Sequence, residues 1–462
     1  MIKLNSRKKI KRYILKYDKH IVLIFLLIVF FCYAIFIALH IDRGIIPDEI
    51  SHFAFSKQFS TTIGIPTELP EAYRYGVYIT QSPFLFNWIN GRLINIVNII
   101  LPSTSVWWLL VILRIINVLY SLGTIFFCYL FSKEFIKLKW WQLLPVFFLT
   151  NTLMFVFLSG GLNYDNLTNL LCFAGLYFLA KVLAHNAFLP NSLGWMICIA
   201  LGCLTKFTVL PLALAMGIVW VTYLIKNRKQ VLPYKFQGKR IILLSFLLLL
   251  LIIGNLAIYG HNLVVYQSII PECEDILTEE ECKLDFYNMR MEKYGLEEKL
   301  TMSESIIRGY PNPIEYFFHW IAIYTSAIFG IGSHRNYKTS FRILSHWSLF
   351  LWVFIISIIN KIKINFKNSS FILIFLFYLF ILFIKNYNGD LASGFKHFGE
   401  NGRYFFPVIG ILFIALTKGI MKIPNIIVRK LTLIFALLLY FFTGPLTFIY
   451  RYNTAFSDWF VR

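Results

Sequence analysis

Apolar runs about as long as a bilayer is thick recur along the whole chain and constrain its fold more than any other feature. Residues 21–39, 241–258 and 371–384 carry no charge and are separated by polar segments. A helix needs about 20 apolar residues to cross the hydrocarbon core, whereas the strands of a membrane barrel alternate apolar and polar residues. With 58% hydrophobic and 15% charged residues, the chain is too apolar for an ordinary soluble protein. We therefore predict an all-α polytopic membrane protein.

Basic residues cluster between the apolar runs and account for the net charge of +21. The positive-inside rule explains such an excess, so no nucleic-acid partner is expected. Basic residues also precede the first run, which places the N-terminus in the cytoplasm: Lys3, Arg7, Lys8, Lys9, Lys11, Arg12, Lys16 and Lys19. No small-residue cleavage site follows this run, so we expect it to be retained as a span.

Alternation of the loops from a cytoplasmic N-terminus predicts about eleven spans. They are expected near residues 21–40, 106–131, 141–158, 167–184, 193–205, 208–225, 240–259, 345–360, 370–385, 404–418 and 430–449. Residues 1–462 then form one transmembrane unit, with long extracytoplasmic loops at 41–105 and 260–344. The break at Thr205-Lys206 and Pro211 predicts two short helices, and 314–331 is expected to lie at the outer interface.

One motif follows immediately after the first apolar run. Residues 46–53 read Ile-Pro-Asp-Glu-Ile-Ser-His-Phe. A proline followed by two carboxylates is typical of a helix start, and on that helix Asp48 and His52 would share a face. Two interpretations stay open: a well-capped helix at the membrane surface, or a centre where a carboxylate acts as general base or orients a substrate hydroxyl. On the second interpretation Asp48 and Glu49 are the candidate catalytic residues, and His52 binds substrate.

A second candidate segment leads into a late apolar run. Residues 399–407 read Gly-Glu-Asn-Gly-Arg-Tyr-Phe-Phe-Pro. A lone arginine at this depth commonly extends to the interface, but its planar fork also suits bidentate binding of phosphate. We predict that Arg403 and Tyr404 bind substrate, with Glu400 and His397 as nearby contacts.

Three further polar groups interrupt apolar stretches. Tyr164 and Asp165 belong to the turn Gly-Gly-Leu-Asn-Tyr-Asp-Asn at 160–166, where Asn and Asp also serve as ordinary turn residues. Lys206 lies between two short apolar helices, where an ammonium requires a partner or an anionic ligand. Arg114 lies within the second predicted span, where pairing with a carboxylate is the expected structural role.

Two of the seven cysteines lie in a polar loop. Cys273 and Cys282 flank an acidic stretch and would form a disulfide if the loop faces an oxidising compartment. Spacing alone leaves a disulfide and two free thiols equally open. The other cysteines fall in apolar stretches and are expected to be small membrane-buried side chains.

Motifs for nucleotide or zinc chemistry are missing from the sequence. It contains no Walker-type glycine loop, zinc-spaced Cys/His cluster, Rossmann fingerprint or Gly-x-Ser-x-Gly elbow. What remains is a set of outer carboxylates with an arginine and a lysine near the membrane. This pattern suits a lipid-linked anionic substrate.

Together these motifs resemble a family of bacterial polytopic membrane proteins of unknown function. That family carries Pro-Asp-Glu-x-x-His-Phe after the first span and Gly-Arg-Tyr-x-x-Pro late in the chain, here residues 47–53 and 402–407. The match continues at Arg114, Asn163-Tyr164-Asp165 and Thr205-Lys206 and so covers most of the chain. The family in turn is similar to the GT-C glycosyltransferases, which include protein O-mannosyltransferases, lipid A aminoarabinose transferases and oligosaccharyltransferases.

The resemblance implies a GT-C-like bundle of about eleven helices in the bacterial inner membrane. It implies transfer of a sugar from a polyprenyl-phosphate donor to a glycan or protein acceptor outside, usually with inversion at the anomeric carbon. An acidic residue of the first outer loop commonly lies at the active centre of that superfamily. Asp48 is accordingly the expected base, with Glu49 as the alternative.

The remaining motif residues take roles around that base. Arg403 and Lys206 are expected to contact the phosphate, and His52 to orient the carboxylate or the acceptor. Tyr164 and Asp165 would line the sugar site. As a departure from the superfamily, the first loop contains no Asp-x-Asp pair, so no cofactor is assigned and a divalent cation is left open.

Two other functions remain open at the level of sequence. A lipid-linked glycan polymerase or ligase would use the same donor chemistry. A transporter or flippase for glycolipids would also have intramembrane charges and broken helices. The lack of an internal repeat and the large aromatic first loop argue against the transporter.

Overall fold

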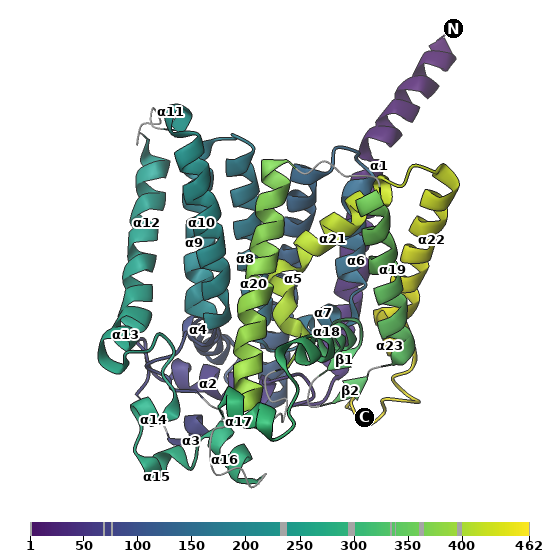
Figure 1. The fold of residues 1–462 in the computed structure, drawn as a ribbon. Helices are drawn as coiled ribbons and strands as arrows, with labels where there is room; N and C mark the ends of the chain where they lie inside the picture. Colours follow the sequence, from purple (N-terminus) through teal and green to yellow (C-terminus); the bar gives the residue numbers. More distant parts are fainter. Residues whose placement is uncertain are drawn as a thin grey trace.

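In a computed structural model of the chain, long helices stand side by side as a bundle (Figure 1). The structure describes residues 2–67, 70–74, 77–231, 238–293, 301–332, 335–337, 339–359, 365–394 and 400–461. Among these residues, ten helical segments are long and apolar enough to cross a membrane, and one bent helix pair would make eleven. The predicted all-α polytopic fold with about eleven spans is therefore confirmed.

The candidate spans take up most of the bundle. They are α1 (Ile2–His40, apolar from Lys19), α5 (Val106–Phe135), α8 (Tyr164–Leu183), α9 (Phe188–Thr205), η2 (Phe207–Val209) with α10 (Leu210–Lys226), α12 (Lys239–Asn255) with η3 (Leu256–Gly260) and α13 (His261–Tyr266), α19 (Ser340–Ile359), α20 (Phe366–Ala392), η4 (Gly402–Phe405) with α21 (Phe406–Met421), and α22 (Ile426–Thr443) with α23 (Pro445–Tyr450). The bent pair consists of η1 (Trp141–Leu143) with α6 (Leu144–Thr150), and α7 (Leu153–Ser159).

Shorter elements fill the connections. They are α2 (Glu49–Ser60), α3 (Pro70–Tyr73), α4 (Leu85–Ile100), α11 (Arg228–Val231), α14 (Cys273–Ile276), α15 (Glu279–Cys282), α16 (Phe286–Lys293), α17 (Met302–Ile307), α18 (Pro313–Phe329), β1 (Ile331–Gly332) and β2 (Asn336–Tyr337). The two strands pair antiparallel, with Ile331 opposite Tyr337 and Gly332 opposite Asn336.

Three stretches of the bundle are irregular, and the sequence indicated two of them, the break near Lys206 and the stretch 314–331. The stretch expected at 141–158 is bent by 65° between α6 and α7. The chain also breaks between α9 and η2, where Lys206 adopts extended backbone, and Pro211 is the second residue of α10. Finally, α18 runs across the end of the bundle rather than along it (Figure 1). Its first helical residue is Pro313, which suits a helix start because that position needs no N–H partner.

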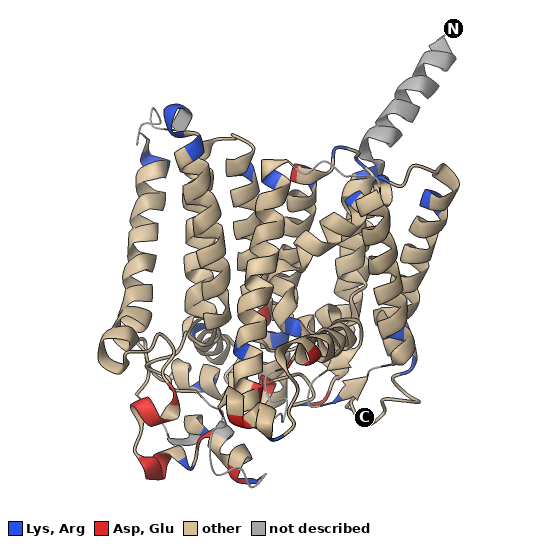
Figure 2. Ribbon diagram, viewed as in Figure 1, with Lys and Arg blue, Asp and Glu red and all other residues tan. Residues whose placement is uncertain are grey.

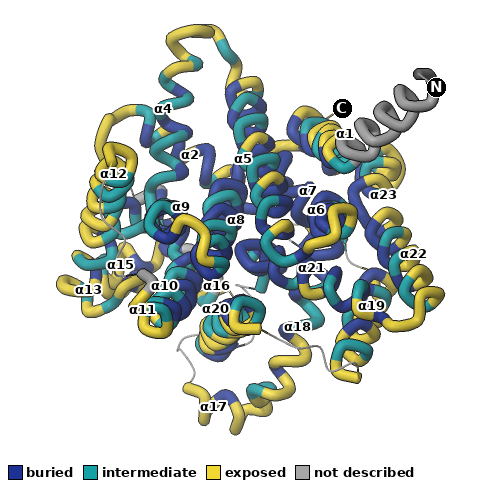
Figure 3. Tube along the Cα trace, turned by 90° about the horizontal axis from the view of Figure 1, so that it is seen from above, coloured by how far each residue is buried: buried dark blue, intermediate teal, exposed yellow. Residues whose placement is uncertain are grey.

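The apolar surface is turned outward on several helices. Viewed along the bundle, buried residues gather in the middle and exposed residues lie at the periphery (Figure 3). On α12 no residue is buried, and large apolar side chains such as Ile242, Leu243 and Phe246 are exposed. Such exposure is unfavourable in water but expected against lipid chains.

Charged residues separate toward opposite ends of the bundle (Figure 2). Lysines and arginines gather at the end that holds α11 and the start of α12, which we call the basic end. Most of the acidic residues lie toward the other end, where α14 and α15 are found, which we call the acidic end.

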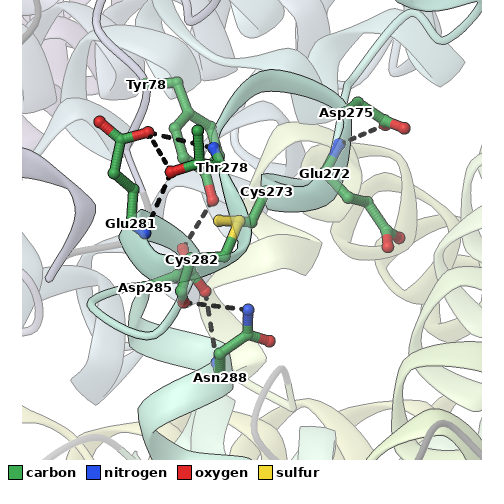
Figure 4. Close-up of a disulfide and its surroundings, with 9 residues drawn as sticks. All are labelled: Tyr78, Glu272, Cys273, Asp275, Thr278, Glu281, Cys282, Asp285 and Asn288. Atoms are coloured by element: carbon green, nitrogen blue, oxygen red, sulfur yellow. Dashed lines mark hydrogen bonds between the residues drawn. A yellow bond between two sulfur atoms is a disulfide. The ribbon is translucent and has the colours of Figure 1, made fainter.

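Two long connections meet at the acidic end. Tyr78 donates a hydrogen bond of 2.6 Å to Asp285, and Asn262 donates one of 3.0 Å to the carbonyl of Gln81. A disulfide joins Cys273 at the start of α14 to Cys282 at the end of α15 (Figure 4). The connection between α1 and α5 is therefore tied to the connection that follows α13.

Candidate active site at the acidic end of the bundle

The backbone after α1 is fixed by the turn that precedes α8. A Cβ atom on Gly161 would overlap the side chain of Ile46, so only glycine permits this approach. Asn163 donates a hydrogen bond of 2.7 Å to the carbonyl of Pro47, and its side-chain oxygen caps α8 by accepting from the N–H of Asp165. One asparagine thus fixes both the Pro47-Asp48 segment and the start of α8.

Asp48 occupies the N-cap position of α2, but its side chain does not cap the helix. The helix begins at Glu49, so Pro47 lies before the cap and not at the first helical position expected from the sequence. Asp48 has a φ of 57°, in the left-handed region that aspartate tolerates better than most residues, and its carboxylate makes no capping hydrogen bond. The carboxylate is therefore available for another partner.

Glu49 and Arg114 form a buried ion pair. Arg114 Nε lies 2.8 Å from Glu49 Oε1 and Nη2 lies 2.6 Å from Oε2, and both side chains are inaccessible to solvent. Glu49 also accepts from the N–H of Leu162 at 3.1 Å, while Arg114 donates to the carbonyl of Ile41 at 2.8 Å. This network holds the end of α1, the start of α2 and the turn before α8 together.

Asp48 reaches Arg403, which comes from η4. The Arg403 Nη2 atom lies 2.5 Å from Asp48 Oδ2. A second pair lies alongside, with Lys206 Nζ 2.5 Å from Asp165 Oδ1. The two pairs are linked, because Arg403 Nε lies 3.5 Å from Asp165 Oδ2, close enough for an ion pair but too long for a good hydrogen bond.

Aromatic rings enclose these charges. The Lys206 ammonium lies 4.2 Å from the centroid of the Tyr164 ring and 4.5 Å from that of Tyr404. The ring of Tyr164 packs against His52, with centroids 4.4 Å apart. These cation–π contacts add to the stabilisation that the Asp165 carboxylate gives the ammonium.

Several buried polar atoms of the site have no hydrogen-bond partner among the described residues. They are both ring nitrogens of His52, Arg403 Nε and Nη1, and Asp165 Oδ2. Buried polar atoms are normally satisfied, so these atoms are the ones able to bond a ligand that enters the site. A ligand at the Asp48–Arg403 pair would therefore find both hydrogen-bond donors and acceptors next to it.

The electrostatic environment keeps Asp48 ionised and His52 neutral. Burial raises the pKa of Asp48, but the charges of Arg403, His52 and Lys206 together outweigh it and lower the pKa to about 2. Burial lowers the pKa of His52 to about 4, although the neighbouring Asp48 opposes this shift. At neutral pH the first loop thus presents a carboxylate beside an uncharged imidazole.

Glu400, which precedes η4, belongs to a different cluster, with Tyr316 and Asp390. Tyr316 of α18 lies 2.8 Å from Glu400 Oε1 and 2.5 Å from Asp390 Oδ2. Burial raises the pKa of Tyr316, and the two carboxylates raise it further, so the phenol stays protonated. Gly402 packs so closely on Ala327 that a Cβ would overlap it, which fixes η4 against α18.

The structure brings together most of the residues that the motifs indicated. Asp48, His52, Tyr164, Asp165, Lys206, Arg403 and Tyr404 form one contiguous cluster. Glu49 and Arg114 lie behind it, Cys273 and Cys282 lie in the acidic loop, and His397 lies outside the described residues. Sequence reasoning missed the positioning role of Asn163, which the helix-capping pattern Asn-x-Asp could have indicated. It also missed Tyr316 and Asp390, for which the sequence offers no signal.

Within the described part of the chain, no group of three or more His, Cys, Asp or Glu side chains is arranged to hold a metal ion. The cluster instead joins four helix ends: the start of α2, the start of α8, the α9–η2 break and η4. Helix N-termini favour negative charge, so three of these ends support an anion.

Comparisons with known proteins give distant structural likenesses. No family model and no curated protein matches the sequence. ArnT from Cupriavidus metallidurans in the apo state is 14% identical with a TM-score of 0.47, and the match covers 89% of this chain and 62% of ArnT. The Archaeoglobus fulgidus oligosaccharyltransferase tethered with an acceptor peptide is 14% identical with a TM-score of 0.49, covering 97% of this chain and 59% of that one.

A further solved structure is the oligosaccharyltransferase AglB from Archaeoglobus fulgidus in complex with an inhibitory peptide and a dolichol-phosphate. It is 14% identical with a TM-score of 0.49, and the match covers 94% of this chain and 56% of that one. The chain thus spans less than two thirds of the length of each of these structures. Likenesses at this level assign no activity by themselves.

Proposed function

We propose that the chain is a membrane glycosyltransferase that moves a sugar from a polyprenyl-phosphate donor to an acceptor at the acidic end. The Asp48–Arg403 pair carries the proposal. It places a carboxylate, with a side chain 36% exposed, against an arginine whose Nε and Nη1 atoms have no hydrogen-bond partner among the described residues. A base for an acceptor hydroxyl and a site for an anionic leaving group are thus adjacent.

The anionic part of the donor is assigned to the Arg403 side of the pair. The planar fork of Arg403 suits two phosphate oxygens, and Lys206 adds an ammonium beside it. The converging N-termini of α2, α8 and η4 contribute further positive potential. Because the site lies at the end of apolar spans, a phosphate attached to a long lipid reaches it from the membrane.

The transfer itself is a single displacement. The acceptor oxygen forms a bond to the anomeric carbon, the bond from that carbon to the phosphate oxygen breaks, and the electron pair leaves with the polyprenyl phosphate. Asp48 takes the acceptor proton, and Arg403 with Lys206 stabilises the departing phosphate. Attack opposite the leaving group inverts the anomeric carbon.

A pKa of about 2 makes Asp48 a weak base in the resting site. Phosphate oxygens would compete with Asp48 for Arg403 and so loosen the ion pair. The pKa of Asp48 then rises as the donor binds, so Asp48 becomes a stronger base in the complex with the donor. Glu49 has no comparable freedom, because Arg114 and two backbone N–H groups occupy its oxygens.

The remaining residues complete the site in this proposal. The ring nitrogens of neutral His52, which have no hydrogen-bond partner among the described residues, serve the acceptor hydroxyl or orient Asp48. Tyr164, Asp165 and Tyr404 line the sugar position. Glu400, hydrogen-bonded to Tyr316, holds η4 in place rather than touching the reacting atoms.

We place the site outside the cytoplasm of a bacterial cell, in its inner membrane. The basic end carries the lysine and arginine excess that marks cytoplasmic loops. The acidic end, with the site and a disulfide, then faces the oxidising side. Lipid-linked sugar donors and envelope glycans or secreted proteins meet on that side.

The test compares surface glycans and glycoproteins by mass spectrometry in four strains of the source organism: wild type, a deletion, and the deletion complemented with Asp48→Asn or Asp42→Asn. Asp42 is an exposed aspartate of the same loop and provides the matched control. We expect one sugar to be missing in the deletion and in Asp48→Asn and present with Asp42→Asn. Full modification by a normally folded Asp48→Asn protein would remove the base assignment, and unmodified glycan trapped in the cytoplasm would indicate a flippase instead.

A further inference from the structure

Lys385 lies beside the proposed phosphate site but did not stand out in the sequence. It belongs to α20, near the acidic end of that helix, and its ammonium lies 3.9 Å from the centroid of the Phe207 ring. Phe207 directly follows Lys206 at the break between α9 and η2. Lys385 and Lys206 therefore flank the same break.

The charges around this break are unevenly compensated. Asp48 neutralises Arg403, and Asp165 neutralises Lys206. In the described part of the chain, no carboxylate lies within ion-pair distance of Lys385. Lys206 and Glu272 are the charged groups that act on it from farther away.

An ammonium in this position requires an explanation. A lysine near the end of a span often extends to the membrane surface, and Lys385 is exposed. Its ammonium lies over the ring of Phe207, which directly follows Lys206, and the charge of Lys206 acts on it, so the two cations repel each other unless an anion joins them. An aromatic face does not supply that anion.

We propose that Lys385 is a substrate-binding residue that contacts the phosphate of the lipid-linked donor together with Lys206 and Arg403. This inference rests on the proposed function and deepens it. The two ion pairs of the site sum to zero charge, and Lys385 adds one positive charge. A sugar phosphodiester carries one negative charge, and Lys385 can meet it directly because Glu272 acts on the ammonium only from beyond ion-pair distance.

The experiment measures binding of undecaprenyl phosphate to the purified full-length protein in phosphatidylcholine nanodiscs by native mass spectrometry. Polyprenol of the same chain length and inorganic phosphate are the other two probes. The variants are Lys385→Gln, Lys385→Arg and, as a matched control, Lys283→Gln, which changes an exposed lysine of the acidic loop. The thermal unfolding midpoint of each unliganded variant shows whether the change disturbs the fold.

We expect Lys385→Gln to weaken binding of undecaprenyl phosphate by roughly 10-fold to 100-fold, as for loss of one hydrogen bond to a charged group. Lys385→Arg and Lys283→Gln should bind as the wild type does, and polyprenol should bind all four proteins equally. Equal binding of undecaprenyl phosphate by wild type and Lys385→Gln would overturn the role of Lys385 alone. Tighter binding of inorganic phosphate than of the lipid would overturn the lipid headgroup as its ligand. A wild type that binds no undecaprenyl phosphate would instead remove the proposed function.

Discussion

Arg403 Nη2 lies 2.5 Å from Asp48 Oδ2, although 355 positions separate the two residues in the chain. The contact joins the turn after α1 to η4, which opens a late span. Both residues belong to motifs that interrupt apolar sequence, and the bundle brings those interruptions to one end. Changes to either residue are therefore expected to act on one centre.

Arg403 variants should separate charge from geometry. Arg403→Lys keeps a positive charge but loses the planar fork, and Arg403→Ala loses both. We expect Arg403→Ala to lower the transfer rate by about 100-fold to 1,000-fold, with Arg403→Lys in between, as for a removed oxyanion contact. The assay follows sugar transfer from a polyprenyl-phosphate donor in detergent micelles. Arg74→Ala, at an exposed arginine of the first loop, is the control, and unchanged kinetics of Arg403→Ala would contradict the assignment.

Neutralising Asp48 and neutralising Glu49 should have different effects on stability and on transfer. Glu49→Gln leaves Arg114 buried without its anion, and breaking such a pair costs about 3–5 kcal/mol of stability. Asp48→Asn should cost less stability than Glu49→Gln, because the Asp48 side chain is partly exposed and Asp165 stays within ion-pair distance of Arg403, while it abolishes transfer. Thermal unfolding in detergent and the transfer assay distinguish the two. A Glu49→Gln protein as stable as the wild type but inactive would point to Glu49 as the base.

Because His52 is buried in its neutral form, the protein should be less stable in mild acid than at neutral pH. The pKa of His52 is lowered from 6.5 to about 4, so between these values the unfolded chain binds a proton that the folded chain does not. Stability is then full above pH 6.5 and falls as the pH drops to 4, by on the order of 3 kcal/mol. Asp48 contributes only below this window, because its pKa falls from 3.8 to about 2.

Unfolding midpoints measured from pH 7 to pH 4 test the role of His52. His52→Gln should flatten the acid side of the profile, whereas His261→Gln, at an exposed histidine, should leave the wild-type shape. Parallel profiles for His52→Gln and the wild type would show that another group is responsible.

Labelling of Cys273 and Cys282 tests both whether they form a disulfide and on which side of the membrane their loop lies. A membrane-impermeant maleimide applied to intact cells should label Cys273 and Cys282 only after reduction. In the chain-entropy model a loop of this length contributes about 3 kcal/mol, and we expect the loss to be confined to the acidic loop. Hydrogen exchange of residues 267–293 measures it. Labelling of the two thiols without reduction, or the lack of it in intact cells after reduction, would contradict the expected pairing or orientation.

The sequence alone predicted the helical membrane fold and the segments that meet at the site. Whether a run of residues can cross a bilayer depends on its own length and polarity, so it can be predicted without knowing neighbours. The same reasoning located the charged interruptions at Asp48, Lys206 and Arg403. A polar group that breaks an apolar run requires a partner, wherever that partner lies.

Only the tertiary structure decided which partner each group takes. Asp48 and Glu49 are adjacent and chemically alike, yet one faces Arg403 and the other is enclosed by Arg114. Glu400 lies in the same motif as Arg403 but turns to Tyr316. The hydrogen bonds of a buried charge depend on helices that are distant in the chain, whose relative rotation local sequence does not encode. The apolar pattern therefore determined where polar groups gather, and packing determined which of them are left to bind a substrate.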